Sequence, residues 1–219
     1  CGSTNTLMAS ELVKKYSADL AICLDGGADR VIILDELGNE IDGDQLIALI
    51  ANNLKSENKI QGDTIVSTVM SNLGLLRYLK DLGLNLFRTP VGDRYVSEIM
   101  KEKGFNFGGE KSGHIIMTDY SSTGDGLLAA LYFLSILKDS GKTTSQLLNV
   151  FKPTPQKLLN LNFESKDDPL DNPEFNKTIY ELRKKISDSG EILVRKSGTE
   201  PVIRIMIQHN DAKIFEEIL

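Results

Sequence analysis

The sequence is short of residues that mark several protein classes. Its 219 residues include no tryptophan, two histidines and two cysteines, Cys1 and Cys23. So few cysteines exclude a disulfide framework and predict a reducing, cytoplasmic environment. No apolar run is long enough to span a bilayer, and the first residues lack the basic segment and apolar core of a secretory signal. We therefore expect no membrane association.

Basic residues are also in deficit. The chain carries 25 Lys and Arg against 31 Asp and Glu, a net charge of -6. Nucleic-acid binders usually carry a basic patch, so we expect no nucleic-acid partner. An acidic chain still permits a local basic pocket, and an anionic substrate is therefore compatible with this charge.

Both ends of the sequence look interrupted. It opens with Cys-Gly-Ser-Thr and no methionine, and it stops at Leu219 inside the helical pattern NDAKIFEEIL. That pattern has no C-cap signal. We therefore expect these residues to be a piece of a longer protein.

Strand-like and helical segments alternate up to Val150. Short apolar, β-branched runs predict strands, and apolar residues spaced three or four apart predict helices. The predicted strands are 18–24, 30–35, 63–69, 85–90, 105–110 and 114–119. The predicted helices are 6–16, 42–55, 72–83, 93–104 and 124–141, the second of them capped by Asp42. This alternation predicts an α/β fold with a largely parallel sheet covered by helices.

The pattern changes after Val150. FKPTPQ is typical of a linker, and a strand (157–163), an amphipathic helix (174–190) and two more strands (191–197 and 202–208) follow. We expect a separate small α+β domain of about 70 residues.

The first of four chemically distinctive loops is the run Asp-Gly-Gly-Ala-Asp-Arg at 25–30, between two apolar segments. Carboxylates held at strand ends suit a hard cation such as Mg²⁺, which prefers oxygen ligands. A strand turn with solvated acids would have the same pattern. Spacing alone leaves both interpretations open.

The second loop, TPVGDRYV, leads into a predicted helix. Gly92 permits a tight turn, and Asp93 is expected to cap the helix. Without other context, the loop is no more than a helix start that carries a surface arginine, Arg94.

The third loop, GGEKSGH, ends at His114. Glycines on both sides of Glu110 and Ser112 allow a close approach to a ligand, and both side chains can hydrogen-bond sugar hydroxyls. A glycine-rich hairpin turn is the plainer interpretation. His114 alone is typical of a locally satisfied hydrogen-bonding residue rather than a catalyst.

The fourth loop, RKSGTEPVIR, joins the last two predicted strands. Ser197, Gly198 and Thr199 offer hydroxyls and backbone N–H groups in a compact turn, and Arg195 and Arg204 add the charge and geometry that suit a phosphate. The plainer interpretation is a hairpin with a Ser-Gly turn. Together the four loops predict a ligand with a phosphate at one end, hydroxyls in the middle and a cation near the other end, which is a sugar phosphate.

In these motifs the chain resembles the α-D-phosphohexomutases, in the same order and over nearly its whole length. CGST resembles the end of the family's second domain, DGGADRV its metal loop, VGDRYV and GEKSGH two loops of the third domain, and RKSGTEPVIR the phosphate loop of the fourth. The resemblance implies the end of domain 2 in residues 1–41, a complete α/β domain 3 in 42–150 and a small α+β domain 4, of the TATA-box-binding-protein-like class, in 151–219.

The resemblance also implies a reaction. Members of the family are intramolecular phosphotransferases that interconvert 6-phospho and 1-phospho sugars through a phosphoserine, a bisphosphate intermediate and Mg²⁺. STGDGLLAAL (122–131) and the arginine-led phosphate loop favour the members acting on glucosamine phosphates over those acting on mannose or glucose phosphates. The implied reaction is glucosamine 6-phosphate to glucosamine 1-phosphate, on the route to UDP-N-acetylglucosamine and peptidoglycan.

Carried over position by position, the resemblance implies that Asp25 and Asp29 bind Mg²⁺ and that Arg30 is catalytic. The implied substrate-binding residues are Glu110, Ser112, Arg195, Ser197, Gly198, Thr199 and Arg204.

The sequence departs from the family at several points. The family's metal loop is Asp-x-Asp-x-Asp-Arg, and here Gly27 stands in place of the middle aspartate, which predicts weakened Mg²⁺ binding. Asn5 replaces a usual histidine, and Pro90 replaces a usual basic residue. No Gly-x-Ser-x-Ser-His loop occurs, so the phosphoryl donor is not among these residues.

Three interpretations remain open. The chain is the C-terminal part of a mutase, either cut from it or working with a separate N-terminal half. Alternatively it is a degenerate remnant that folds without catalysing. The third interpretation is a non-catalytic module that binds a sugar phosphate. In each case we expect no mutase activity from these residues alone.

Overall fold

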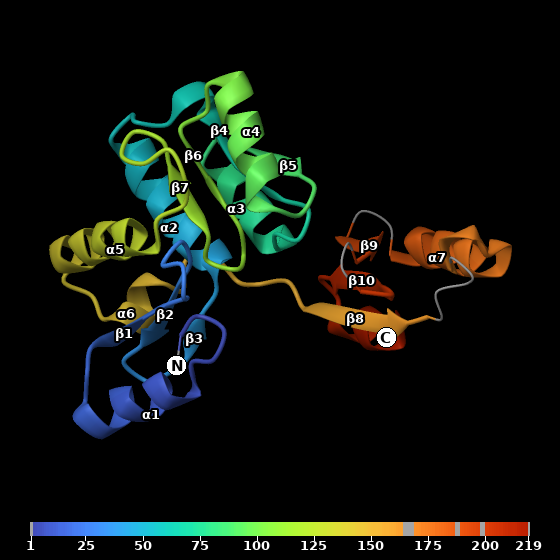
Figure 1. The fold of residues 1–219 in the computed structure, drawn as a ribbon, viewed down its shortest axis with the longest axis horizontal. Coiled ribbons are helices and arrows are strands. Elements are labelled where there is room, and N and C mark those ends of the chain that lie inside the picture. The colour runs from blue at the N-terminus through green and yellow to red at the C-terminus, as the bar shows by residue number, and fades with distance from the viewer. Residues whose placement is uncertain (1, 164–168, 187–188, 198–199, 219) are drawn as a thin grey trace. The chain divides into compact units, whose positions relative to one another are not determined.

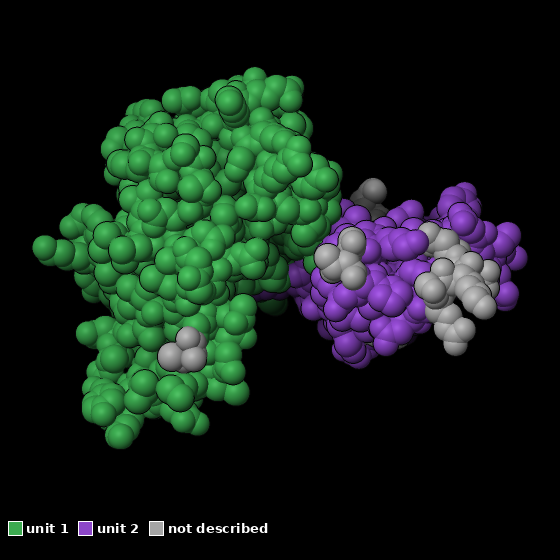
Figure 2. Space-filling view, in the orientation of Figure 1, with its two compact units in different colours: residues 1–152 green, residues 153–219 purple. Residues whose placement is uncertain are grey.

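The chain folds into two compact units. The computed structural model describes residues 2–163, 169–186, 189–197 and 200–218. Residues 1–152 form unit 1 and residues 153–219 form unit 2 (Figures 1 and 2). No helix in the described ranges is long and apolar enough to cross a membrane.

A four-stranded sheet, in the order β5-β4-β6-β7, forms the centre of unit 1. Its strands are β4 (Thr64–Thr68), β5 (Asn85–Thr89), β6 (Phe107–Gly109) and β7 (Ile115–Met117). Strand β4 pairs in parallel with both β5 and β6, whereas β7 runs antiparallel to β6. The predicted, largely parallel sheet is therefore confirmed.

Helices cover both faces of this sheet (Figure 1). They are α2 (Gly43–Ser56), α3 (Leu73–Asp81) and α4 (Asp93–Lys103), and α5 (Gly126–Ser140) packs against α2. Successive strand residues point to opposite faces, so Ile65 and Phe107 pack with α2 and α3, whereas Val66 and Ile116 pack with α4. A three-layer α/β/α arrangement results.

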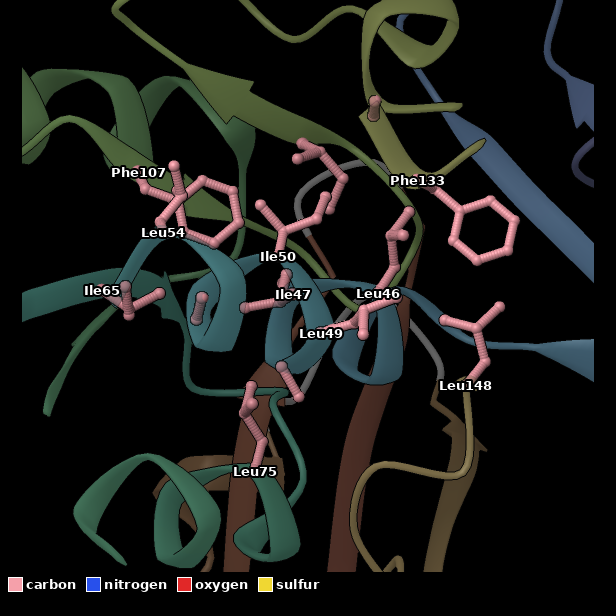
Figure 3. Close-up of a cluster of buried hydrophobic side chains, with 14 of the residues drawn as sticks. Leu46, Ile47, Leu49, Ile50, Leu54, Ile65, Leu75, Phe107, Phe133 and Leu148 are labelled. Atoms are coloured by element: carbon pink, nitrogen blue, oxygen red, sulfur yellow. The ribbon is translucent and has the colours of Figure 1, made fainter. Parts of the chain in front are cut away.

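Helix α2 lies inside the larger core (Figure 3). Ile47 and Ile50 are completely buried, as are the alanines that follow each of them. A helix that is apolar nearly all round must be enclosed by other elements. Its start is capped as predicted, because the Asp42 carboxylate accepts a hydrogen bond from Gln45 N at 3.2 Å.

A second, antiparallel sheet precedes α2. Its strands are β1 (Leu20–Leu24), β2 (Val31–Asp35) and β3 (Glu40–Ile41), and α1 (Leu7–Tyr16) packs near it. Ile33 on β2 belongs to the same core as α2, which joins this sheet to the α/β layers. The sequence pattern missed β3, α6 (Thr144–Leu147) and the 3₁₀ helix η1 (Gln61–Asp63), because elements this short show no periodicity.

Unit 2 is a small α+β structure, as expected. Its antiparallel strands lie in the order β8-β10-β9. They are β8 (Gln156–Asn162), β9 (Gly190–Lys196) and β10 (Val202–His209), and the helical elements are η2 (Pro169–Asp171), α7 (Pro173–Ile186) and α8 (Ala212–Ile218). Ile203, Ile205 and Ile207 form one face of β10 and pack against both longer helices.

Replacement of Leu54 by alanine should destabilise unit 1 strongly. Leu54 is 2% exposed in the last turn of α2, and removing such a side chain typically costs about 2–5 kcal/mol. The matched control is Leu131→Ala on α5, where the leucine is 55% exposed, and it should change stability by less than about 0.5 kcal/mol. Urea unfolding followed by circular dichroism measures both. Equal losses for the two variants would contradict this core assignment.

Candidate functional site

Three segments of unit 1 that are distant in sequence meet beside the β1–β2 turn. Val31 N donates to Gly113 O at 3.0 Å, and Gly126 N donates to Ala28 O at 2.9 Å. Arg30 also forms an isolated antiparallel bridge with His114. The acidic turn, the loop between β6 and β7, and the start of α5 therefore lie against one another.

An aspartate–histidine contact connects the first and third loops. His114 Nδ1 lies 3.0 Å from Asp29 Oδ2, although the two residues are 85 positions apart. His114 is 2% exposed, whereas the Asp29 side chain is 39% exposed. Gly124 is required beside the imidazole, because a Cβ at that position would collide with the ring. The sequence offered no signal for this pair, since neither residue's local pattern identifies the other.

The environment of Asp29 favours its ionised form. Partial desolvation raises the pKa of Asp29, but hydrogen bonds from its own backbone N–H and from His114, together with the polar contact with the Asp25 side chain, outweigh that effect. The net result is a pKa below the ordinary aspartate value. The turn therefore carries a negative charge at neutral pH.

The predicted metal ligands are close together but few. Asp25 Oδ1 accepts a hydrogen bond from Arg30 N at 3.2 Å, which folds the turn back on itself. Gly27 lies beside Asp29, since a Cβ on Gly27 would be 2.6 Å from Asp29 Oδ1. Within the described ranges no three acidic, histidine or cysteine side chains are grouped to hold a metal ion. Two carboxylates suit Mg²⁺ only if water completes its shell.

Arg30 adds positive charge next to this turn. It is half-buried, and its Nε is buried with no hydrogen-bond partner in the part of the chain that the structure describes. A buried guanidinium donor without a partner is poised to bind an anion.

Glu110 connects the second and third loops. Its side chain is almost buried, at 7% exposed, and Oε1 accepts a hydrogen bond from Gly92 N at 3.1 Å. The loop closes on itself through Glu110 N to His114 O at 2.8 Å and Gly113 N to Glu110 O at 2.9 Å. Ser112, by contrast, is exposed at the loop tip.

The expected cap at Asp93 is wrong. Gly92 is the N-cap of α4, at φ +135°, and Asp93 is the first helical residue with no capping bond. Only glycine adopts that φ readily, so the chain turns into the helix one residue earlier than the capping pattern predicted. Arg94 is 81% exposed, as the plainer interpretation predicted, and it pairs with Glu98 at 2.7 Å.

In unit 2 the two predicted phosphate-binding arginines face each other. Arg195 on β9 is the cross-strand partner of Arg204 on β10. Burial and the neighbouring Arg204 charge lower the pKa of Arg195. Arg204 Nη2 binds Glu200 at 3.0 Å, yet the Nε of each arginine is buried without a hydrogen-bond partner among the residues described. Two like charges side by side would be stabilised by an anion.

Ser197 lies directly after β9. It is 8% exposed, and its N–H donates to Val202 O at 2.8 Å, which begins the turn between β9 and β10. Gly198 and Thr199 lie outside the described residues.

The chain matches two family models. Residues 42–154 match "Phosphoglucomutase/phosphomannomutase, alpha/beta/alpha domain III", and residues 158–219 match "Phosphoglucomutase/phosphomannomutase, C-terminal domain". A phosphoglucosamine mutase of Ruegeria pomeroyi is 52% identical over 211 residues, which cover 96% of this chain and 47% of that protein. One of Phenylobacterium zucineum is 50% identical over 219 residues, 100% of this chain and 48% of that protein. The chain therefore spans about half the length of these curated relatives.

Solved structures share the fold. A phosphoglucomutase/phosphomannomutase family protein of Burkholderia thailandensis matches with a TM-score of 0.81 and 24% identity over 99% of this chain and 48% of its own. An Aspergillus fumigatus N-acetylphosphoglucosamine mutase, in complex with GlcNAc-6P and magnesium, matches with a TM-score of 0.73 and 20% identity over 91% of this chain and 50% of its own. At these identities the likeness concerns the fold alone.

Replacement of His114 by alanine should raise the pKa of Asp29. The substitution removes one of the hydrogen bonds that favour the carboxylate, while partial desolvation still favours the neutral acid. A titration of the Asp29 side-chain carbonyl carbon by NMR measures the change. His209→Ala, which alters a buried histidine of unit 2, should leave that titration unchanged. An unaltered midpoint in His114→Ala would show that the contact does not stabilise the carboxylate.

Proposed function

The chain belongs to the phosphoglucomutase/phosphomannomutase family, and we propose that it is the C-terminal part of a phosphoglucosamine mutase. The proposed whole enzyme interconverts glucosamine 6-phosphate and glucosamine 1-phosphate through a phosphoserine and a bisphosphate intermediate. Relatives with about half of their residues identical to this chain carry that name. Mutases of glucose or mannose phosphates are the alternative within the family.

One observation carries the proposal: the three loops of the sugar-phosphate interpretation that belong to unit 1 come together around Glu110. Its carboxylate is held in place by Gly92 N, and the loop that carries it is hydrogen-bonded to the turn of Asp29 and Arg30. A fixed, nearly buried carboxylate next to glycines can accept hydrogen bonds from sugar hydroxyls. Ser112 at the loop tip would supply a further contact.

The remaining residues suit the charge of a phosphoryl group. Arg30 would stabilise the negative charge that develops during transfer, and Arg195, Ser197 and Arg204, together with Gly198 and Thr199, would bind a phosphate. Enzymes that move phosphoryl groups depend mainly on positioning and on charge stabilisation. Arg30, Arg195 and Arg204, whose buried Nε atoms have no partner among the described residues, supply such charge.

Asp25 and Asp29 would hold Mg²⁺. When bound, the ion would neutralise charge on the transferred phosphoryl group. Gly27 provides no third carboxylate, so we expect weak binding. The residues of this chain include no phosphoserine loop, and an N-terminal half, in the same or a separate chain, would supply the phosphoryl donor. The same proposal includes that the whole enzyme acts in the cytoplasm, in the synthesis of peptidoglycan precursors.

A sugar-phosphate-binding module without catalysis is the second candidate, and a degenerate remnant is the third. Gly27 favours both of these candidates, because it lacks the charge of a third metal ligand. A measurement of sugar-phosphate binding separates the two candidates, because only the module would still bind a sugar phosphate.

Residues 1–219 alone should bind glucosamine 6-phosphate without converting it. Calorimetry measures binding, and a coupled assay for glucosamine 1-phosphate measures turnover. Glu110→Gln should weaken binding about 10- to 100-fold, as the loss of a charged hydrogen-bond acceptor does. The matched control, Glu98→Gln, changes an exposed glutamate paired with Arg94 and should bind normally.

Turnover by these residues without a partner would contradict the expected inactivity. Binding that is unaffected by Glu110→Gln would exclude Glu110 as a sugar ligand. If the folded wild type does not bind glucosamine 6-phosphate, the degenerate remnant is the interpretation that remains. Tighter binding of glucose or mannose 6-phosphate would instead indicate the alternative mutases.

Gly27→Asp should strengthen Mg²⁺ binding about tenfold or more, because a third carboxylate would join Asp25 and Asp29. The new side chain requires a shift of the half-exposed Asp29 carboxylate, which lies 2.6 Å from the added Cβ. Gly26→Asp is the matched control, because a Cβ there meets nothing within 4 Å. Calorimetric titration with Mg²⁺ compares the three proteins. A wild type that binds Mg²⁺ as tightly as Gly27→Asp would refute the role assigned to the missing carboxylate.

A further inference from the structure

The two arginines of unit 2 lie in one row on the face of the sheet that points away from its helices. Ile203 and Ile205 on β10 pack with the apolar residues of α7 and α8, and Arg204 between them lies on the other face, because successive strand residues alternate. Arg195 on β9 and Asn160 on β8 are the two cross-strand partners of Arg204. The row therefore carries two positive charges and one exposed amide.

The arginine pair is only partly neutralised by the residues that the structure describes. Like charges directly opposite each other destabilise a sheet, and burial and the Arg204 charge lower the pKa of Arg195. Glu200 is the one acid among these residues that pairs with either arginine, and its Oε2 lies 3.0 Å from Arg204 Nη2. Within this part of the chain, one of the two positive charges is therefore balanced.

The ion pair uses little of the hydrogen-bonding capacity of Arg204. A guanidinium binds an anion best through two parallel N–H groups, but Glu200 accepts from Nη2 alone in the described structure. The Nε atoms of Arg204 and Arg195 are buried and have no hydrogen-bond partner among the residues described. A phosphate has enough oxygens to accept from both guanidinium groups, whereas the Glu200 carboxylate contacts only one of them.

The Glu200 side chain can leave Arg204 without disturbing its own backbone. The side chain is 59% exposed, against 31% for that of Arg204. The backbone is fixed independently, because Val202 N donates to Glu200 O at 2.8 Å and Phe163 N donates to Pro201 O at 3.1 Å. An exposed ion pair contributes little free energy. A phosphate that binds both arginines would therefore replace the carboxylate.

We propose that the Glu200 carboxylate competes with phosphate for Arg204: it pairs with this arginine until a phosphate group that bridges Arg204 and Arg195 displaces it into solvent. Glu200 thereby lowers the affinity of the arginine pair for phosphate. This inference deepens the proposed function and rests on it, since that function assigns phosphate binding to these arginines.

Titration of the 219-residue chain with inorganic phosphate, at constant pH and ionic strength, tests the displacement. NMR follows the Nε–H signals of Arg195 and Arg204 and the side-chain carboxyl carbon of Glu200. In the wild type all three signals should shift with one midpoint, because a single event binds the phosphate and releases the carboxylate. A Glu200 signal that stays constant while the arginine signals shift would overturn the proposal.

Glu200→Gln should bind phosphate about two- to fivefold more tightly than the wild type, as expected when one exposed ion pair no longer competes. Glu200→Ala, which removes the hydrogen-bond acceptor as well as the charge, should also bind phosphate more tightly. If Glu200 instead held Arg204 in position, loss of the acceptor would weaken binding. Unchanged or weaker binding by either variant would thus contradict the competition.

The matched control is Glu191→Gln on the same strand as Arg195. Glu191 accepts a hydrogen bond from Gln208 Nε2 at 3.0 Å, and it lies four residues from Arg195 along β9, about 13 Å away. Charges separated by more than the screening length interact weakly at physiological salt, so this control should bind phosphate as the wild type does. A gain equal to that of Glu200→Gln would show an effect of net charge alone and would refute the role of Glu200.

The same titrations with glucosamine 6-phosphate separate this inference from the proposed function. If inorganic phosphate behaves as expected but the sugar phosphate binds no more tightly, the proposed function fails and the role of Glu200 stands. If neither ligand shifts the arginine signals of the wild type or of Glu200→Gln, the arginine pair binds no phosphate and the role of Glu200 is refuted. The amide signal of Glu110 would then still report whether the sugar phosphate binds at the loop between β6 and β7.

Discussion

The close approach of Gly113 to Val31 is the contact on which the rest of the candidate site depends. Gly113 has φ +88°, and a Cβ at that position would collide with Val31 O. Glycine alone therefore permits the hydrogen bond from Val31 N to Gly113 O that joins the acidic turn to the loop between β6 and β7. Because His114 follows Gly113 directly, the same contact brings its imidazole to Asp29. A backbone constraint thus underlies the contact between His114 and Asp29.

The apolar core of unit 1 fixes the helix that contacts the loop between β6 and β7. Helix α2 is enclosed on nearly all sides by the core residues of unit 1, so its position is fixed by packing rather than by solvent-exposed bonds (Figure 3). Its first turn lies against the loop, where a Cβ on Gly43 would meet Glu110 O and Lys111 O. The well-packed helix α2 consequently begins with a backbone group, Gly43 N, that donates a hydrogen bond to Lys111 O in the loop.

Local sequence predicted the elements of the fold better than the contacts of the site. The cap at Asp42 depends on residues within one turn, and the sequence predicted it. The prediction of a cap at Asp93 was wrong because the backbone of Gly92, rather than a side-chain hydrogen bond, sets the start of α4. The bond between His114 and Asp29 joins positions 85 residues apart, which only the folded chain brings together. The family resemblance identified the loops, but no local pattern indicated that Asp44 in α2 is completely buried.

The missing aspartate at position 27 has a limited structural consequence. Asp29 is held by its own backbone and by His114, and these hydrogen bonds keep its pKa low. Asp25 is likewise engaged with Arg30 N. Both carboxylates are thus oriented by protein groups. In the proposed function, Gly27 would therefore affect the affinity of the turn for Mg²⁺ rather than its folding. A chain that has lost one ligand charge can still keep the geometry of the loops around Glu110, and it is this geometry that a sugar phosphate would recognise.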